Sequence, residues 1–166
     1  SDNQEGYHSL LSGVVPDVKI FESLEEEQAF IGELLRELLI EYEPQEICLV
    51  ARTNSILGRD YIPLVEMADI PRVVLGQEDI GEKKGIRIAT MHRVKGLEFP
   101  CIIICGANDG VIPLTAPWLV DDPTGKVEHE ERERSLLFVA ATRARDRLMV
   151  TAAGMPSPYI LAKPKS

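Results

Sequence analysis

The sequence is poor in cysteine and in aromatic residues, and it lacks a long uninterrupted apolar run. Its cysteines, Cys48, Cys101 and Cys105, are an odd number, and all three lie in apolar stretches. We therefore expect buried free thiols, and we assign the CxxxC spacing of the last two to the core. No apolar run is long enough to span a membrane, and the first residues lack the pattern of a secretion signal. These absences argue against a disulfide-bonded secreted scaffold and favour a cytoplasmic protein.

The size and composition are those of one soluble domain. The chain has 166 residues, of which 45% are hydrophobic and 27% are charged, which is enough to build a core. Residues 1–16 are polar and show no period, so we expect a leader that is flexible or in part a cloning remnant. Residues 17–166 are then the folded domain, and they contain no internal repeats.

The net charge of −9 argues at first against a nucleic-acid partner, but the charge is unevenly distributed. Residues 1–46 hold twelve acids against two bases, whereas the rest of the chain holds fifteen acids and sixteen bases. Within that second part, residues 83–95 carry five bases and no acid. A local basic stretch therefore survives in an acidic chain.

Strand patterns alternate with helix patterns along the chain. Short β-rich runs predict strands over 18–23, 46–52, 85–90, 100–107 and 147–153, and helical spacing predicts helices over 23–42, 55–67 and 129–146. The run 100–107 is apolar on both faces, which is typical of a parallel strand covered by helices. The sequence therefore predicts an α/β domain with a mainly parallel sheet.

Details within the predicted helices refine this outline. Ser23 and Glu26 form a capping box, and the glutamates of the first helix, Glu27 among them, are expected on its solvent face. Pro63 is expected to kink or begin the second helix. The third helix is expected to be acidic at its start and basic at its end, as the helix dipole favours. A loop rich in proline, glycine and aspartate precedes it, over 108–127.

Three segments at strand ends carry candidate site residues. In "ATMHRVKGLEF" (89–99), Thr90 ends a strand, and a lysine, a histidine and backbone amides follow on a tight turn, which suits a phosphate. "RTN" places Arg52 after another strand, on the same edge if the sheet is parallel, where a guanidinium can form two hydrogen bonds with a phosphate. "FVAATRARDRL" offers Arg143 one turn beyond Val139. Taken singly, each segment fits an ordinary solvated surface better than a site.

Taken together and in this order, the three segments resemble a known set of motifs. "ARTN", "IATMHRVKGLEFPCIIICG" and "EERERSLLFVAATRARDRL" resemble the motifs conventionally numbered four, five and six of superfamily 1 DNA helicases of the UvrD/Rep/PcrA type, with the RecB/AddA helicase–nucleases close behind. "GMPSPYIL" also resembles the ending of that family, so the resemblance covers most of residues 46–161. It implies a RecA-like, three-layer sandwich of the P-loop NTPase type, and the second of the two RecA-like domains between which ATP binds.

The resemblance also implies roles for residues in an ATP site. Arg52 matches the arginine that reaches the γ-phosphate, and Arg143 matches the arginine finger, so these two are the expected catalytic residues. Lys95, Gly96 and Glu98 of "KGLE" match the positions that face the phosphates and the ribose.

A second set of matched positions lies on the DNA side. Thr90 and His92 match residues that contact single-stranded DNA in that family, and Arg93 adds a phosphate contact that no motif supports. The expected partners are therefore ATP, single-stranded DNA and the first RecA-like domain of the same parent chain.

Motifs that the family needs are missing from this chain. There is no G-x-x-x-x-G-K-[ST] loop and no acidic Walker B pair after an apolar strand. ATP is expected to come with Mg²⁺, whose ligands belong to the first RecA-like domain, and no metal site is expected here. We therefore expect this chain to be inactive alone, as one domain of a larger ATP-dependent DNA helicase or translocase.

The interval between the first two motifs is also short. Only about thirty residues separate "ARTN" from "GIRIAT", where typical members carry a large accessory domain, so we expect this domain to lack that insertion. Two alternatives stay open: a helicase subunit of a helicase–nuclease, and a non-catalytic interaction or regulatory module that keeps the fold alone.

Overall fold

A computed structural model describes residues 14–76 and 83–161, and its centre is a six-stranded sheet in which every pairing is parallel. The expected leader falls outside the described residues up to residue 13. The spatial order is β1-β6-β5-β2-β4-β3. The strands are β1 (Pro16–Phe21), β2 (Ile47–Ala51), β3 (Arg72–Val74), β4 (Ile86–Thr90), β5 (Phe99–Ile104) and β6 (Ala144–Ala153).

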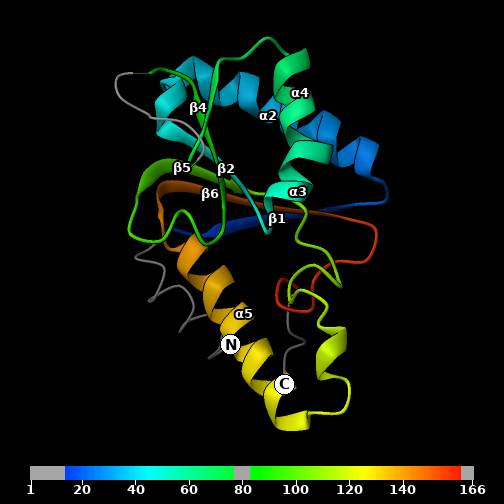
Figure 1. Cartoon of the computed structure of the whole chain (residues 1–166). Coiled ribbons are helices and arrows are strands. Elements are labelled where there is room, and N and C mark those ends of the chain that lie inside the picture. Colours follow the sequence, from blue (N-terminus) through cyan, green and yellow to red (C-terminus); the bar gives the residue numbers. More distant parts are fainter. Residues whose placement is uncertain (1–13, 77–82, 162–166) are drawn as a thin grey trace.

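Helices cover both faces of the sheet (Figure 1). One face packs against α2 (Leu24–Glu41) and a helical segment comprising α3 (Asn54–Ile56) and α4 (Ile62–Met67), whereas the other packs against α5 (Pro123–Ala141). The predicted α/β three-layer sandwich is therefore confirmed. Single-turn 3₁₀ helices, Pro44–Glu46 and Pro117–Leu119, precede β2 and α5. Within the described ranges no helix is long and apolar enough to cross a membrane.

Between α3 and α4 the helix widens into a π-helical stretch, Leu57–Tyr61. Pro63 lies in the first turn of α4. Because proline has no backbone N–H, it cannot donate the hydrogen bond that would continue the helix without interruption. The predicted interruption at Pro63 is confirmed. Tyr61, the last residue of this stretch, is buried, with 1% of the residue exposed.

The sequence predicts that all glutamates of α2 lie on the solvent face, but the structure buries one of them. Glu27 is 0% exposed. Its carboxyl oxygens accept hydrogen bonds from the Tyr61 hydroxyl at 2.6 Å, the Gly106 amide at 2.9 Å and the Thr151 hydroxyl at 2.6 Å. The prediction was wrong because helical spacing alone does not reveal three donors that arrive from distant parts of the chain.

The predicted bounds of the last helix were also wrong. Asp122 caps α5 by accepting a hydrogen bond from the Gly125 amide, and Pro123 occupies the first turn, so the helix begins earlier than 129. It ends at Ala141, and β6 already begins at Ala144. Arg145 therefore lies on a strand, and α5 has no basic residue in its last turn.

Other strand bounds differ less. The short edge strand β3 escaped prediction because three residues carry too little pattern. β5 ends at Ile104, three residues before the predicted end.

The connection from β4 to β5 is unusually short. β2 lies between these two parallel strands, so the chain must return from the carboxyl edge of the sheet to its amino edge. It does so in residues 91–98, without a helix, whereas parallel strands usually need a dozen residues or more. Met91 and Val94 anchor this connection in the core on the α5 side. We call residues 91–98 the crossover segment.

Candidate functional site

A groove of about 690 Å³ lies between α5 and the crossover segment. Its wall includes Arg52 from the end of β2, His92 and Lys95 from the crossover segment, and Glu133 and Val139 from α5. A second cavity, of about 320 Å³, lies where α2 meets β5 and β6, and none of the predicted site residues lines it.

Parallel pairing of β2 and β4 brings the first candidate residues together. Ala51 is in register with Thr90, and the Met91 amide donates to the Ala51 carbonyl at 3.0 Å. Arg52 and His92 therefore leave the sheet at the same edge, as predicted. Because both residues line the groove, one surface holds a residue expected to face a nucleotide and one expected to face DNA.

Thr90 shapes the turn that follows it. Its carbonyl accepts from the Arg93 amide at 3.0 Å and from the Val94 amide at 3.3 Å, and its hydroxyl lies 3.3 Å from the Arg93 amide. Gly96 has a φ of +84°, in the left-handed region that glycine adopts without strain, and so allows the chain to turn. The turn leaves Lys95 exposed on the groove wall.

Arg52 is held by a glutamate rather than left free. Its Nε donates to Oε1 of Glu133 at 2.9 Å, and its Nη2 donates to Oε2 at 2.7 Å. The two side chains are 11% and 6% exposed. Oε1 of Glu133 also accepts from the Leu114 amide at 2.7 Å, while the Leu114 carbonyl contacts Nε2 of His129 at 2.7 Å.

These contacts decide the charge of Glu133. Burial alone would raise the pKa of this carboxyl, but the hydrogen bonds from Arg52 and from the Leu114 amide, with the positive charge of Arg52, outweigh it. The net result is a pKa below the ordinary value of 4.5, so Glu133 is an anion at neutral pH. The charge of Arg52 is therefore largely compensated within the domain.

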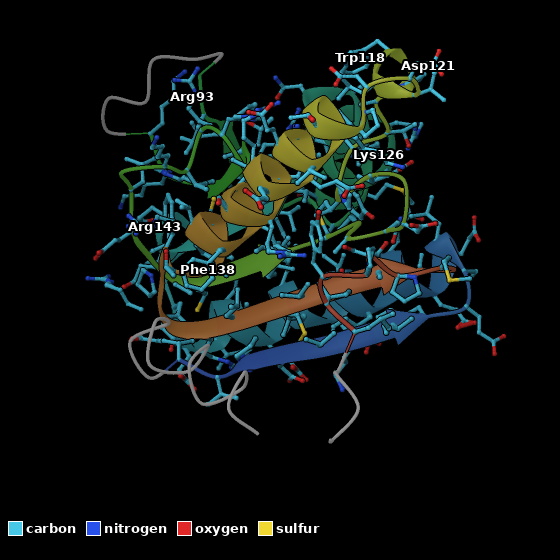
Figure 2. The ribbon with its side chains drawn as sticks, turned by 90° about the horizontal axis from the view of Figure 1, so that it is seen from below. Arg93, Trp118, Asp121, Lys126, Phe138 and Arg143 are labelled. Carbon is cyan, nitrogen blue, oxygen red and sulfur yellow. The ribbon has the colours of Figure 1, made fainter. Side chains whose placement is uncertain are left out.

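Arg143 lies beyond the far end of the groove wall. Its Nε donates to the Val139 carbonyl at 3.2 Å, and its Nη2 contacts the Thr142 hydroxyl at 3.2 Å. Its own carbonyl accepts from the Phe99 amide at 3.0 Å, which places its backbone beside Glu98. Figure 2 shows Arg143 at one end of α5 and Trp118 and Lys126 near the other end.

The structure thus joins some predicted residues and separates others. Arg52, His92 and Lys95 share the groove, whereas Glu98 and Arg143 sit next to each other at the amino edge of the sheet. The Arg93 guanidinium instead lies over Gly76, where an added Cβ would come within 2.7 Å of its Nε.

Glu133 is the site residue that sequence reasoning missed. A signal was present, because Glu133 stands four and seven positions before Leu137 and Ala140, which are buried, and so shares their helix face. No group of three His, Cys, Asp or Glu residues suited to a metal ion occurs in the part of the chain that the structure describes.

Comparison with known proteins gives a match over most of this site. Residues 62–154 match the family model described as the UvrD-like helicase C-terminal domain. This stretch includes the crossover segment, Glu133 and Arg143, and it excludes Arg52.

Curated relatives are longer proteins. The chain is 37% identical over 92 residues to the ATP-dependent DNA helicase PcrA of Bacillus subtilis (strain 168), covering 55% of this chain and 12% of that protein. It is 29% identical over 153 residues to PcrA of Leuconostoc citreum, covering 90% of this chain and 18% of that protein. It is 41% identical over 68 residues to UvrD1 of Mycobacterium bovis, covering 41% of this chain and 8% of that protein.

A solved structure shares the fold. The crystal structure of the C-terminal domain of a possible DNA helicase from Lactobacillus plantarum WCFS1 superposes with a TM-score of 0.66 at 16% sequence identity. The match covers 96% of this chain and 89% of the other.

Proposed function

This chain belongs to the family of UvrD-like helicase C-terminal domains, and from this premise we propose that it forms one wall of the ATP-binding cleft of an ATP-dependent DNA helicase or translocase. The other wall is the first RecA-like domain of the same parent protein. The relatives named as ATP-dependent DNA helicases support this assignment.

The observation that carries the proposal is the groove beside α5. It brings Arg52, His92 and Lys95 onto one wall although they come from two separate parts of the sequence. Cationic side chains and backbone amides at a strand end are suited to phosphate oxygens. We assign Arg52 and Lys95 to the phosphates and Glu98 to the ribose, and Gly96 allows the turn that presents Lys95.

Arg143 has a different task in this proposal. Its guanidinium is held by the carbonyl of Val139 and the hydroxyl of Thr142, which fixes it at the end of α5. An arginine fixed in this way can neutralise charge that develops on a transferring phosphoryl group. We therefore propose Arg143 as the arginine finger, reaching a nucleotide bound mainly by the first domain.

Mg²⁺ accompanies the nucleotide in this proposal. Its protein ligands are assigned to the first RecA-like domain because this sequence lacks the Walker A hydroxyl and the Walker B acids. Residues here contribute positive charge and orientation instead. On this basis the isolated chain does not hydrolyse ATP.

The DNA contact is assigned to the beginning of the crossover segment. His92 is exposed beside the groove, and the Thr90 side chain orients the turn from which His92 projects. The Arg93 side chain lies over Gly76 and is not among the residues that line the groove. We propose that these three residues follow a single strand while Lys95 senses the nucleotide.

The proposal is tested in the full-length parent protein by replacing Arg143 with alanine. ATP turnover at saturating single-stranded DNA is expected to fall by about 10³-fold or more, the range for a lost arginine finger. The affinity for a fluorescent oligonucleotide, followed by anisotropy, is expected to stay unchanged. Arg145→Ala is the matched control, because Arg145 is exposed two residues further along the chain.

Two results would contradict the assignment. Unchanged ATP turnover in Arg143→Ala would refute the assignment of Arg143 as the arginine finger. An equal loss of turnover in Arg145→Ala would mean that turnover depends on the general positive charge at this edge and not on one guanidinium.

A further inference from the structure

Glu133 is unexpected in a groove assigned to phosphates. A buried carboxylate repels an anionic ligand unless its charge is committed elsewhere. Glu133 is 5% exposed, and both of its carboxylate oxygens accept hydrogen bonds. The charge of Glu133 is thus committed to Arg52 and the Leu114 amide, so the question is what this commitment does to Arg52.

The geometry of the Arg52–Glu133 pair shows which edge of the guanidinium is used. The carboxylate binds Nε and one hydrogen of Nη2, which form the side edge. A guanidinium has five N–H donors, so Nη1 and the second hydrogen of Nη2 form an end edge that makes no hydrogen bond with the described residues. That end edge is the one suited to a second, bidentate contact with an oxyanion.

Glu133 is itself held from a second direction. The Leu114 amide donates to its Oε1, and the Leu114 carbonyl is bound by His129, one turn earlier on α5. Both backbone groups of one loop residue are thus bound by side chains from one helix. Glu133 cannot turn away without breaking this second contact, so the direction of Arg52 is fixed by α5 and by the loop after β5.

We propose that Glu133 is a positioning residue for Arg52: it occupies the side edge of the guanidinium and presents the end edge to the groove, ready for the phosphates of a nucleotide. This inference rests on the proposed function. The pair fixes a long side chain before the ligand arrives, so that less conformational freedom is lost on binding.

The test is a double-mutant cycle on ATP turnover in the full-length parent, with saturating ATP and single-stranded DNA. Glu133→Ala is expected to lower kcat by about 10²-fold, the loss typical of a misplaced catalytic group. In the Arg52→Ala background the same change is expected to cause no further loss, since Glu133 then has nothing to position. Glu130→Ala is the control, because it removes a carboxylate from the same helix outside the groove.

A conservative variant guards against a folding defect. Glu133→Gln keeps an oxygen for Arg52 and for the Leu114 amide, and it is expected to retain more turnover than Glu133→Ala while remaining non-additive with Arg52→Ala. Circular dichroism and thermal unfolding of each variant separate a loss of turnover from a loss of structure. If Glu133→Ala does not fold, the cycle is run with Glu133→Gln alone.

Four results would overturn the inference. Higher turnover in Glu133→Ala would mean that the pair restrains Arg52 instead of presenting it. Additive losses would mean that Glu133 acts independently of Arg52. Full turnover in folded Glu133→Ala, with Arg52→Ala impaired, would leave the proposed function standing and refute this inference alone; a parent without ATPase activity would refute both.

Discussion

Removing the carboxyl group of Glu27 tests the buried network that joins α2 to the sheet. In Glu27→Ala, three donors lose their acceptor: the Tyr61 hydroxyl, the Gly106 amide and the Thr151 hydroxyl. These donors belong to the π-helical stretch, to the chain after β5 and to β6. Because Glu27 is 0% exposed, water does not reach them without a rearrangement of the core.

The expected loss follows from what is left behind. Each buried donor without a partner costs about 1–3 kcal/mol. The variant no longer has to bury a carboxyl group, and this gain offsets part of the summed cost of the three unpaired donors. We therefore expect the free energy of unfolding to fall by about 4 kcal/mol. For a domain of this size that corresponds to a fall in Tm of about 10 °C.

Urea unfolding of the 166-residue chain, followed by circular dichroism, measures this loss as a lower midpoint at an unchanged slope. Glu27→Gln keeps the volume and one acceptor oxygen, and the Tyr61 hydroxyl can accept from the new amide, so its loss is expected to be nearer 1 kcal/mol. Glu25→Ala, an exposed change in the same helical turn, is the control. If Glu27→Ala unfolded at the same urea concentration as Glu25→Ala, the network would contribute nothing to stability.

Three further outcomes are expected. The pKa of Glu133 is lowered in the folded state, so its ionisation stabilises the fold above the ordinary pKa of 4.5, and this stability is lost as the pH falls through the folded pKa. When the free energy of unfolding is measured against pH, Glu133→Gln is expected to lack this part of the pH dependence of the wild-type chain. Gly96→Ala forces a side chain into the left-handed region at φ +84°, so the free energy of unfolding, measured in urea, is expected to fall by about 1–2 kcal/mol. Burial raises the pKa of the thiols of Cys48, Cys101 and Cys105, so Ellman's reagent should label none of them in the native chain and all three in denaturant, and rapid native labelling would contradict their burial.

Much of the fold was predictable because its signals are local. The run that becomes β5 is apolar on both faces, and the spacing in α2 repeats every three to four residues, so the alternation of strands and helices and a parallel sheet covered by helices follow from pattern. The three-layer RecA-like arrangement was implied by the family resemblance. The bounds of α5 were not predicted, since Asp122 and Pro123 begin the helix before its apolar spacing starts. β3 is too short to show a period.

The site was predictable only in part, for a physical reason. Motif likeness selects Arg52, Lys95 and Arg143, but it does not reveal what each side chain contacts. The bond from Arg52 to Glu133 joins positions 81 residues apart, and only the packing of α5 beside the end of β2 brings them together. The same applies to Glu27, whose partners lie 34 to 124 residues away.

The crossover segment joins opposite edges of the sheet with few residues to spare. From Thr90 to Phe99 the chain moves back by about six strand residues and sideways by two strands, a direct distance of roughly 22 Å. The nine peptide steps that are present reach about 30 Å when fully extended, and part of that length is used by the turn that begins at Thr90. His92 at one edge of the sheet and Glu98 at the other are therefore joined by only five intervening residues, most of them in hydrogen-bonded turns.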